Sequence, residues 1–158
     1  MPLLGPGESL PAFDLPRGGG GRLSDADLRG RPVALFVYPG DATPSCTREA
    51  QDFTALAPGF AAAGVPVLGL SGGTAAAKDR FARKAALAVP LLADEGRTLI
   101  QALGAWGPKT MYGRTSDGIL RASFLFDAGG LLVRAWEVAR VAGHAAEVLE
   151  AARALRPP

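Results

Sequence analysis

The sequence predicts an α/β fold in which a mixed sheet carries helices on both faces. Two apolar runs of strand length, residues 33–37 and 65–70, contain no alternating polar residues, so both faces of each strand should be covered. A helical pattern follows each run, which is typical of parallel strands joined by crossover helices. Farther on, residues 119–127 and 131–138 flank a glycine-containing turn at 128–130, which predicts an antiparallel hairpin.

The remaining elements follow from glycine, proline and capping residues between the apolar segments. Four glycines at 18–21 indicate an N-terminal hairpin turn, Pro58 is expected to break or kink a helix near its end, and Thr74 should cap the next helix. In chain order we expect a helical turn at 24–28, helices at 45–60, 75–86, 95–103 and 143–155, and a short strand at 90–93. This order is that of a thioredoxin-like sheet, extended by the N-terminal hairpin and expected to form one domain over residues 1–158.

Length, composition and charge exclude several classes of protein. The 158 residues are 48% hydrophobic and 20% charged, which is typical of one globular domain with a sizeable core. The net charge is only +2 and no basic run is interleaved with aromatic residues, so we expect no nucleic-acid partner. No window approaches the ~18 apolar residues of a membrane span, and residues 1–15 lack the pattern of a secretory signal. With a single cysteine, these features predict a soluble, cytoplasmic protein.

Cys46 is the only cysteine, and it follows the first buried strand at the start of a predicted helix. A lone cysteine is most often a small apolar core residue. The first turn of a helix, however, has unpaired N–H groups and the positive end of the helix dipole, which stabilise a thiolate, the reactive form of cysteine. The carboxyl end of a central strand is also where open α/β sheets bind ligands. The position of Cys46 therefore predicts a nucleophile.

Three neighbours of Cys46 carry groups that suit thiol chemistry. Thr43, three residues earlier, could donate its hydroxyl to the thiolate or accept a hydrogen bond from a peroxide, although a turn or cap residue is the simpler interpretation. Pro39 has no N–H to offer and would shield the sulfur from water on one side. Glu49, one helical turn later, could orient an arginine through a bidentate pair or simply lie on a solvated helix face.

The spacing Pro39-x-x-x-Thr43-x-x-Cys46 resembles the active-site motif of the peroxiredoxins. The longer run over residues 38–50 is similar to one branch of that family, the bacterioferritin comigratory proteins, also called PrxQ. Further stretches resemble the same branch in the same order, namely residues 7–15, 106–113, 121–127 and 143–145. The resemblance therefore covers nearly the whole chain.

The resemblance implies a thiol-dependent peroxidase for antioxidant defence that reduces hydrogen peroxide and organic hydroperoxides without a metal or cofactor. It makes Cys46 the peroxidatic cysteine, Thr43 the residue that holds the peroxide oxygens, and Pro39 the cap of the pocket. Arg121 would polarise the peroxide and favour the thiolate, and Glu49 would tether that arginine. By its residue type alone, Arg121 would be interpreted as an exposed strand residue.

The chain departs from the branch in lacking a resolving cysteine. Gln51 stands where many members have one, and residues 74–87, where others place it, contain none. An intramolecular disulfide is therefore impossible, and we expect a one-cysteine cycle with an external reductant, namely thioredoxin, glutaredoxin or a low-molecular-weight thiol. Ser45 stands where the family often has glycine and is expected to matter little to the chemistry. The branch resemblance implies a monomer or a small homodimer.

Two other functions are compatible with a single cysteine on this fold. A thiol–disulfide oxidoreductase is disfavoured because the chain has no C-x-x-C pair. A redox sensor, in which sulfenylation of Cys46 is a signal, would show one stoichiometric oxidation in place of turnover.

The remaining polar and aromatic candidates are expected to be structural. His144, the only histidine, is expected at a helix start or on the surface, since a metal site usually needs three or four ligands. The loop at 71–74 lacks the terminal Lys-Ser/Thr of a P-loop and is interpreted as a turn. Trp106, Met111 and Tyr112 are expected in the core rather than in a site, although the family resemblance would place them near the rim of the pocket.

Overall fold

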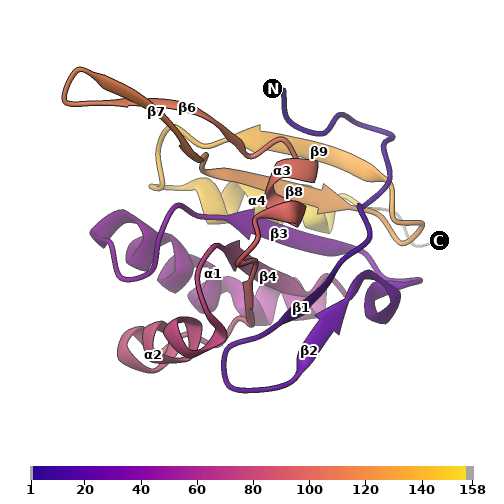
Figure 1. The fold of residues 1–158 in the computed structure, drawn as a ribbon. Coiled ribbons are helices and arrows are strands. Elements are labelled where there is room, and N and C mark those ends of the chain that lie inside the picture. Colours follow the sequence, from indigo (N-terminus) through magenta and orange to yellow (C-terminus); the bar gives the residue numbers. More distant parts are fainter. Residues whose placement is uncertain (1, 156–158) are drawn as a thin grey trace.

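A five-stranded mixed sheet forms the centre of the computed structural model, which describes residues 2–155 except for the side chain of Met111 (Figure 1). The strand order is β5-β4-β3-β8-β9. The strands are β3 (Val33–Val37), β4 (Val67–Ser71), β5 (Leu91–Ala93), β8 (Ala122–Phe126) and β9 (Leu132–Glu137). Strands β3, β4 and β5 are parallel, whereas β8 pairs antiparallel with both β3 and β9, which confirms the predicted mixed sheet.

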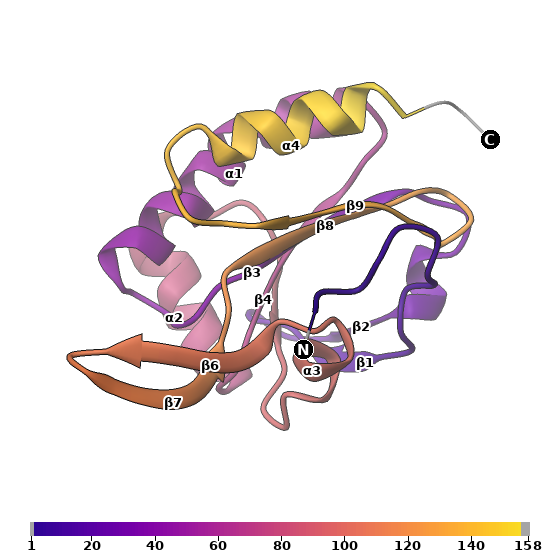
Figure 2. The same ribbon diagram turned by 90° about the horizontal axis from the view of Figure 1, so that it is seen from above.

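Helices cover both faces of this sheet, as the uninterrupted apolar strands predicted. The helices are α1 (Pro44–Ala62), α2 (Ala75–Ala85), α3 (Thr98–Ala102), α4 (His144–Arg153) and the 3-10 turn η1 (Asp25–Leu28). Side chains of β3 alternate between the faces. Phe36 packs on the face that holds Phe53 of α1, and Leu35 packs on the face that holds Ile100 of α3. Figure 2 shows α1 and α4 on one side of the sheet and α3 on the other.

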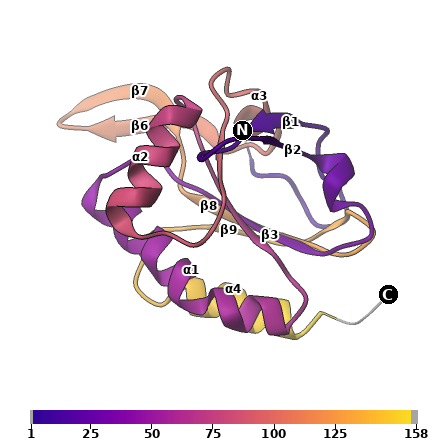
Figure 3. The ribbon, with the colours of Figure 1, turned by 90° about the horizontal axis from the view of Figure 1, so that it is seen from below.

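The N-terminal hairpin consists of β1 (Asp14–Pro16) and β2 (Arg22–Ser24), which pair antiparallel around the predicted glycine turn. It lies near α3, as Figure 3 shows, and its turn also contacts α2. A Cβ atom added to Gly18 would lie only 2.9 Å from the backbone nitrogen of Asp79 in α2. Glycine at this position therefore permits a close approach that a larger residue would block.

The stretch before β8 forms a second hairpin that the sequence analysis did not predict. Strands β6 (Trp106–Met111) and β7 (Arg114–Ile119) pair antiparallel and project from the body of the molecule (Figure 2). The predicted strand at 119–127 is therefore wrong in its first part, because β7 ends at Ile119 and β8 begins at Ala122.

Of the two aromatic residues of this hairpin expected in the core, Trp106 packs against it and Tyr112 does not. Tyr112 stands at the tip with a relative exposure of 99%. Trp106, at the root, is half-buried, and the guanidinium carbon of Arg97 lies 4.5 Å from its ring centroid. Met111 carries a side chain that lies outside what the structure describes.

Helix α1 continues through Pro58 to Ala62, so that proline does not break the helix, and the alternative expectation of a kink stays a prediction. The turn that follows Pro58 is held by packing. Phe60 is buried and its ring centroid lies 6.0 Å from that of Phe53, and a Cβ atom added to Gly59 would lie 3.1 Å from Leu149 of α4. These contacts offset the hydrogen bond that a proline removes from a helix.

Within residues 2–155, no helix combines the length and the apolar character that crossing a membrane requires.

Candidate active site

Cys46 lies in the first turn of α1, directly after the loop that leaves the carboxyl end of β3. Pro44 occupies the first helical position, which suits a residue without an N–H. Thr43 is the N-cap, and its Oγ1 accepts a hydrogen bond of 3.2 Å from the backbone nitrogen of Cys46. The cap fixes the backbone of Cys46 while its sulfur remains at the positive end of the helix dipole. Cys46 is 1% exposed.

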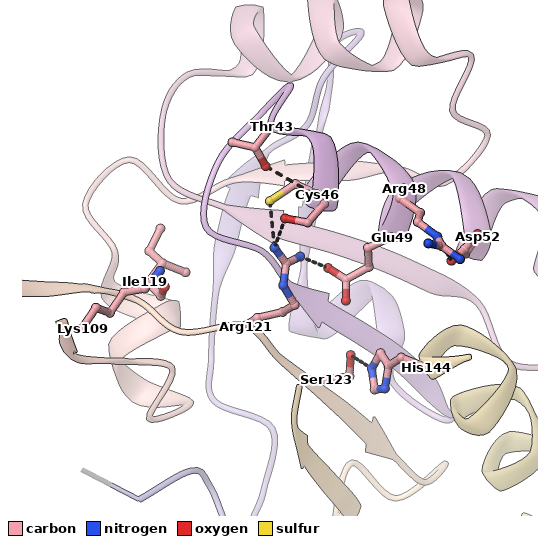
Figure 4. A network of polar contacts seen from close by, with 11 residues as sticks. Thr43, Cys46, Arg48, Glu49, Asp52, Lys109, Ile119, Arg121, Ser123 and His144 are labelled. Atoms are coloured by element: carbon pink, nitrogen blue, oxygen red, sulfur yellow. Dashed lines mark hydrogen bonds and ion pairs between the residues drawn. The ribbon is translucent and has the colours of Figure 1, made fainter. Parts of the chain in front are cut away.

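Arg121, the residue directly before β8, reaches the sulfur although it lies 75 positions from Cys46 along the chain. Its Nη2 donates to Cys46 Sγ at 3.3 Å, as Figure 4 shows, and also to Ser45 Oγ at 3.0 Å. The antiparallel register of β3 and β8 pairs Val37 with Ala122, which places the start of β8 beside the end of β3. A guanidinium at this distance stabilises a thiolate over a neutral thiol.

Glu49 holds the other side of the guanidinium. Its Oε1 accepts a hydrogen bond of 2.6 Å from Arg121 Nη1, and Figure 4 shows the carboxylate below the first turn of α1. With 1% relative exposure, Glu49 does not lie on a solvated helix face, so that interpretation is wrong. Only Oε1 makes the contact with Arg121, so the pair is not bidentate. Within the described residues, Oε2 is buried without a hydrogen-bond partner.

Burial and the mutual contact of the two side chains shift the pKa values of Glu49 and Arg121. It raises the pKa of Glu49 from 4.5 to about 7, and the charge and hydrogen bond of Arg121 oppose that rise. Burial lowers the pKa of Arg121, but the nearby Glu49 and Cys46 outweigh burial and raise it overall. Arg121 therefore stays cationic beside the sulfur, and Glu49 is the member of the pair that can change its charge near neutral pH.

Thr43 and Pro39 lie in the segment that leads from β3 into α1. Thr43 is exposed and uses its oxygen as an acceptor in the cap, so its O–H remains able to donate to a ligand. Pro39 opens the loop between β3 and α1 and is half-buried. Its proposed shielding of the sulfur stays a prediction.

The structure also reveals polar contacts that the sequence analysis missed. Ser45, of which little was expected, shares Arg121 Nη2 with the sulfur. Lys78 of α2 lies buried against Asp41, and Asp41 also accepts a hydrogen bond from Tyr38. The burial of Lys78 could have been predicted from helical spacing. Phe81 and Ala85 follow it by three and seven residues, so all three lie on the apolar face of α2.

His144 is the first residue of α4, as predicted, but it is buried rather than on the surface. Its Nε2 lies 2.8 Å from Ser123 Oγ, and its ring meets Phe53 and Trp136 edge-on at centroid distances of 6.1 Å and 6.0 Å. Burial lowers the pKa of His144. The histidine therefore packs neutral between α4, α1 and β9.

Comparisons with known proteins point to one family. A model described as the AhpC/TSA family matches residues 6–135. The chain is 40% identical over 149 residues to peroxiredoxin Bcp of Xanthomonas campestris, with 92% of this chain and 93% of the relative covered. It is 39% identical over 145 residues to a putative peroxiredoxin of Mycobacterium tuberculosis, with 92% of each covered.

Solved structures agree with the sequence relatives. Peroxiredoxin Q of Xanthomonas campestris superposes with a TM-score of 0.85 at 38% identity, covering 90% of each chain. A cysteine-to-serine mutant of PrxQ from Xylella fastidiosa gives a TM-score of 0.91 at 30% identity, covering 98% of each chain. These similarities confirm the predicted thioredoxin-like fold.

Proposed function

Because the chain belongs to the AhpC/TSA family, in its bacterioferritin comigratory protein branch of peroxiredoxins, we propose that Cys46 is the peroxidatic cysteine of a one-cysteine cycle. The family makes the protein a thiol-dependent peroxidase, with a peroxide as substrate and a thiol as reductant. The observation that carries the proposal is the 3.3 Å contact between Arg121 Nη2 and Cys46 Sγ at the N-terminus of α1.

In the first step, the Cys46 thiolate attacks one oxygen of the peroxide. An S–O bond forms, the O–O bond breaks, and the departing oxygen keeps the electron pair and takes a proton from solvent to leave as water or an alcohol. Cysteine is thereby oxidised to a sulfenic acid. Negative charge moves from sulfur to the departing oxygen, so donors along that line favour the transition state. Arg121 Nη2 and the Thr43 hydroxyl are the side-chain donors that we assign to this task.

In the second step, a thiol must come from outside, because the chain has no second cysteine. Its sulfur attacks Cys46, an S–S bond forms and water leaves; a second thiol then displaces Cys46 and restores it. Thioredoxin, glutaredoxin and low-molecular-weight thiols are the reductants that we propose. Hydrogen peroxide and organic hydroperoxides are the proposed substrates, and the Xanthomonas campestris bacterioferritin comigratory protein has alkyl peroxide reduction activity.

Mass spectrometry of the oxidised protein tests this cycle directly. One equivalent of peroxide should add one oxygen atom to Cys46, and a small thiol added afterwards should give a mixed disulfide and then the free thiol. Steady turnover in excess thiol should accompany these species. A single oxidation without turnover would contradict the proposal and favour the redox sensor.

Replacing Thr43 by valine is expected to reduce both stability and peroxidase activity. The change removes the cap of α1 and the proposed hydroxyl donor, so we expect a loss of about 1 kcal/mol in unfolding free energy. We also expect kcat/KM for peroxide to fall by about tenfold or more.

Thr74 provides a matched control, because its Oγ1 caps α2 in the same way and accepts a hydrogen bond of 3.1 Å from Ala77. Thr74→Val should lose similar stability in a urea titration while keeping its kcat/KM. Thr43→Ser should retain both properties. Equal activity losses in the two valine variants would limit Thr43 to a structural role.

A further inference from the structure

Lys78 is the most unusual charged residue outside the site, because its side chain is completely buried. Its Nζ lies 2.9 Å from Asp41 Oδ2, donates to the carbonyl oxygen of Gly72, and lies 5.8 Å from the ring centroid of Tyr38. These three neighbours match the three N–H donors of an ammonium group. Lysine is almost never fully buried unless it is paired, and these neighbours supply the partners that a buried ammonium group needs.

The partner of Lys78 belongs to the loop that leads to Cys46. Asp41 Oδ1 accepts a hydrogen bond of 2.9 Å from the Tyr38 hydroxyl, while Oδ2 faces Lys78. Burial, followed by the charge of Asp41, raises the pKa of Tyr38, so its hydroxyl keeps the proton that it donates. Asp41 is thereby fixed from the end of β3 and from α2, which lies beside this loop (Figure 3).

The same loop contains a disfavoured backbone conformation. Ala42 has a φ of 63°, in the left-handed region that residues other than glycine rarely adopt. Such a conformation persists where the surroundings hold it in place. Asp41, held by Lys78, precedes Ala42, and Thr43, held by its cap, follows it. Ala42 therefore lies between two held residues, in the segment that leads into the first turn of α1.

We infer that Lys78 is a positioning residue that holds the loop 38–43 closed and thereby controls access to the sulfur of Cys46. The inference rests on the proposed function, and it deepens that function at the same site. The closed loop has opposite effects on the oxidation of Cys46 by peroxide and on the later reduction of its sulfenic acid. It keeps the thiolate beside Arg121 for the attack on peroxide, but it hinders the later approach of a large reductant.

The opposite effects follow from the burial of Cys46, which is 1% exposed. A peroxide needs to bring only one small oxygen atom to the sulfur. A protein thiol must bring its own sulfur into bonding distance along the line of displacement, and the loop or the first turn of α1 must open for that. A small thiol needs less opening. Lys78 therefore favours the oxidation step and selects for small reductants.

The test compares Lys78→Met with wild type in three separate rate measurements. We expect the second-order rate constant for hydrogen peroxide to fall by about tenfold as the loop loses its fixed position. Reduction of the sulfenic acid by reduced thioredoxin should become faster by about tenfold, because opening no longer breaks the buried ion pair. Reduction by 2-mercaptoethanol should change less. The ratio of the thioredoxin rate to the 2-mercaptoethanol rate should therefore be higher in Lys78→Met than in wild type.

Two further variants separate the effect of the Lys78 contact from a general loss of stability. Lys84 lies on the exposed face of the same helix, so Lys84→Met should leave all three rates unchanged. Asp41→Asn weakens the same contact from the other side with little change in size, and it should reproduce the opposite shifts if Lys78→Met does not fold. General destabilisation would slow both half-reactions together, and parallel losses would overturn the inference.

Failure of this inference can be told apart from failure of the proposed function. An inactive wild-type protein would remove the proposed function, whereas an active wild type with unchanged rates in Lys78→Met removes only the positioning role. Hydrogen exchange provides a readout that needs no turnover. Amides at 41–47 should exchange faster in Lys78→Met than in Lys84→Met, and equal exchange there would contradict the loop-holding role.

Discussion

Replacing Cys46 by serine is expected to abolish peroxide reduction, with a loss in kcat/KM of at least about a thousandfold. A serine hydroxyl does not ionise near neutral pH and cannot form a sulfenic acid with a peroxide. No other residue can take over, because the chain contains no second cysteine. The measurement is the consumption of hydrogen peroxide in the presence of excess thiol.

The fold should tolerate this substitution, which makes the kinetic loss interpretable. Serine is close to cysteine in size, its backbone nitrogen can keep the cap from Thr43, and its oxygen can accept the hydrogen bond from Arg121. We expect unfolding free energies within about 1 kcal/mol of each other. The variant also has no thiol, so it should form no mixed disulfide. Turnover comparable to that of the wild type would exclude Cys46 as the nucleophile.

Much of the fold could be predicted because the buried strands are uninterrupted apolar runs. Val33–Val37 is buried at every position, as a central strand covered on both faces requires. The β6–β7 hairpin escaped prediction for the opposite reason. Its strands pair with each other in a separate two-stranded sheet, and the residues of β7 are mostly exposed, so the periodic apolar signal of a core strand is weak there.

In the site, too, residues close to Cys46 in the sequence could be predicted from their spacing, whereas distant residues could not. Thr43, Cys46 and Glu49 follow one another at intervals of three residues, and helix geometry alone places them on one face. Arg121 could be assigned only from the resemblance, because its approach depends on the register in which β8 pairs with β3. The contact between Lys78 and Asp41 joins a helix to a distant loop, and no spacing along the chain encodes that contact.

Replacing Arg121 by methionine is expected to slow the attack on peroxide by about a hundredfold, as for the loss of one preorganised donor at a developing charge. Methionine preserves much of the apolar stem but removes the cation that lies 3.3 Å from the sulfur. Arg134→Met is the matched control, because Arg134 lies on the neighbouring strand β9 and forms an exposed ion pair with Glu147 of α4. That variant should keep its rate constant for peroxide. Similar losses in both variants would show that Arg121 acts through general stability.

The same substitution isolates the second role of Arg121, which is to neutralise Glu49. In Arg121→Met, burial acts on the carboxyl without the opposing cation, so the pKa of Glu49 should rise above its value of about 7. A raised pKa in the folded state stabilises the protein at low pH. That contribution is lost as the pH rises from about 4.5 through the folded-state pKa. Both proteins should therefore lose stability up to about pH 7, and Arg121→Met should continue to lose it above pH 7, where wild type levels off. The double variant Glu49→Gln/Arg121→Met lacks the ionising group, and it should recover this stability while its reaction with peroxide stays slow. Recovery of both properties would instead mean that the charge of Glu49, and not the guanidinium, limits the reaction.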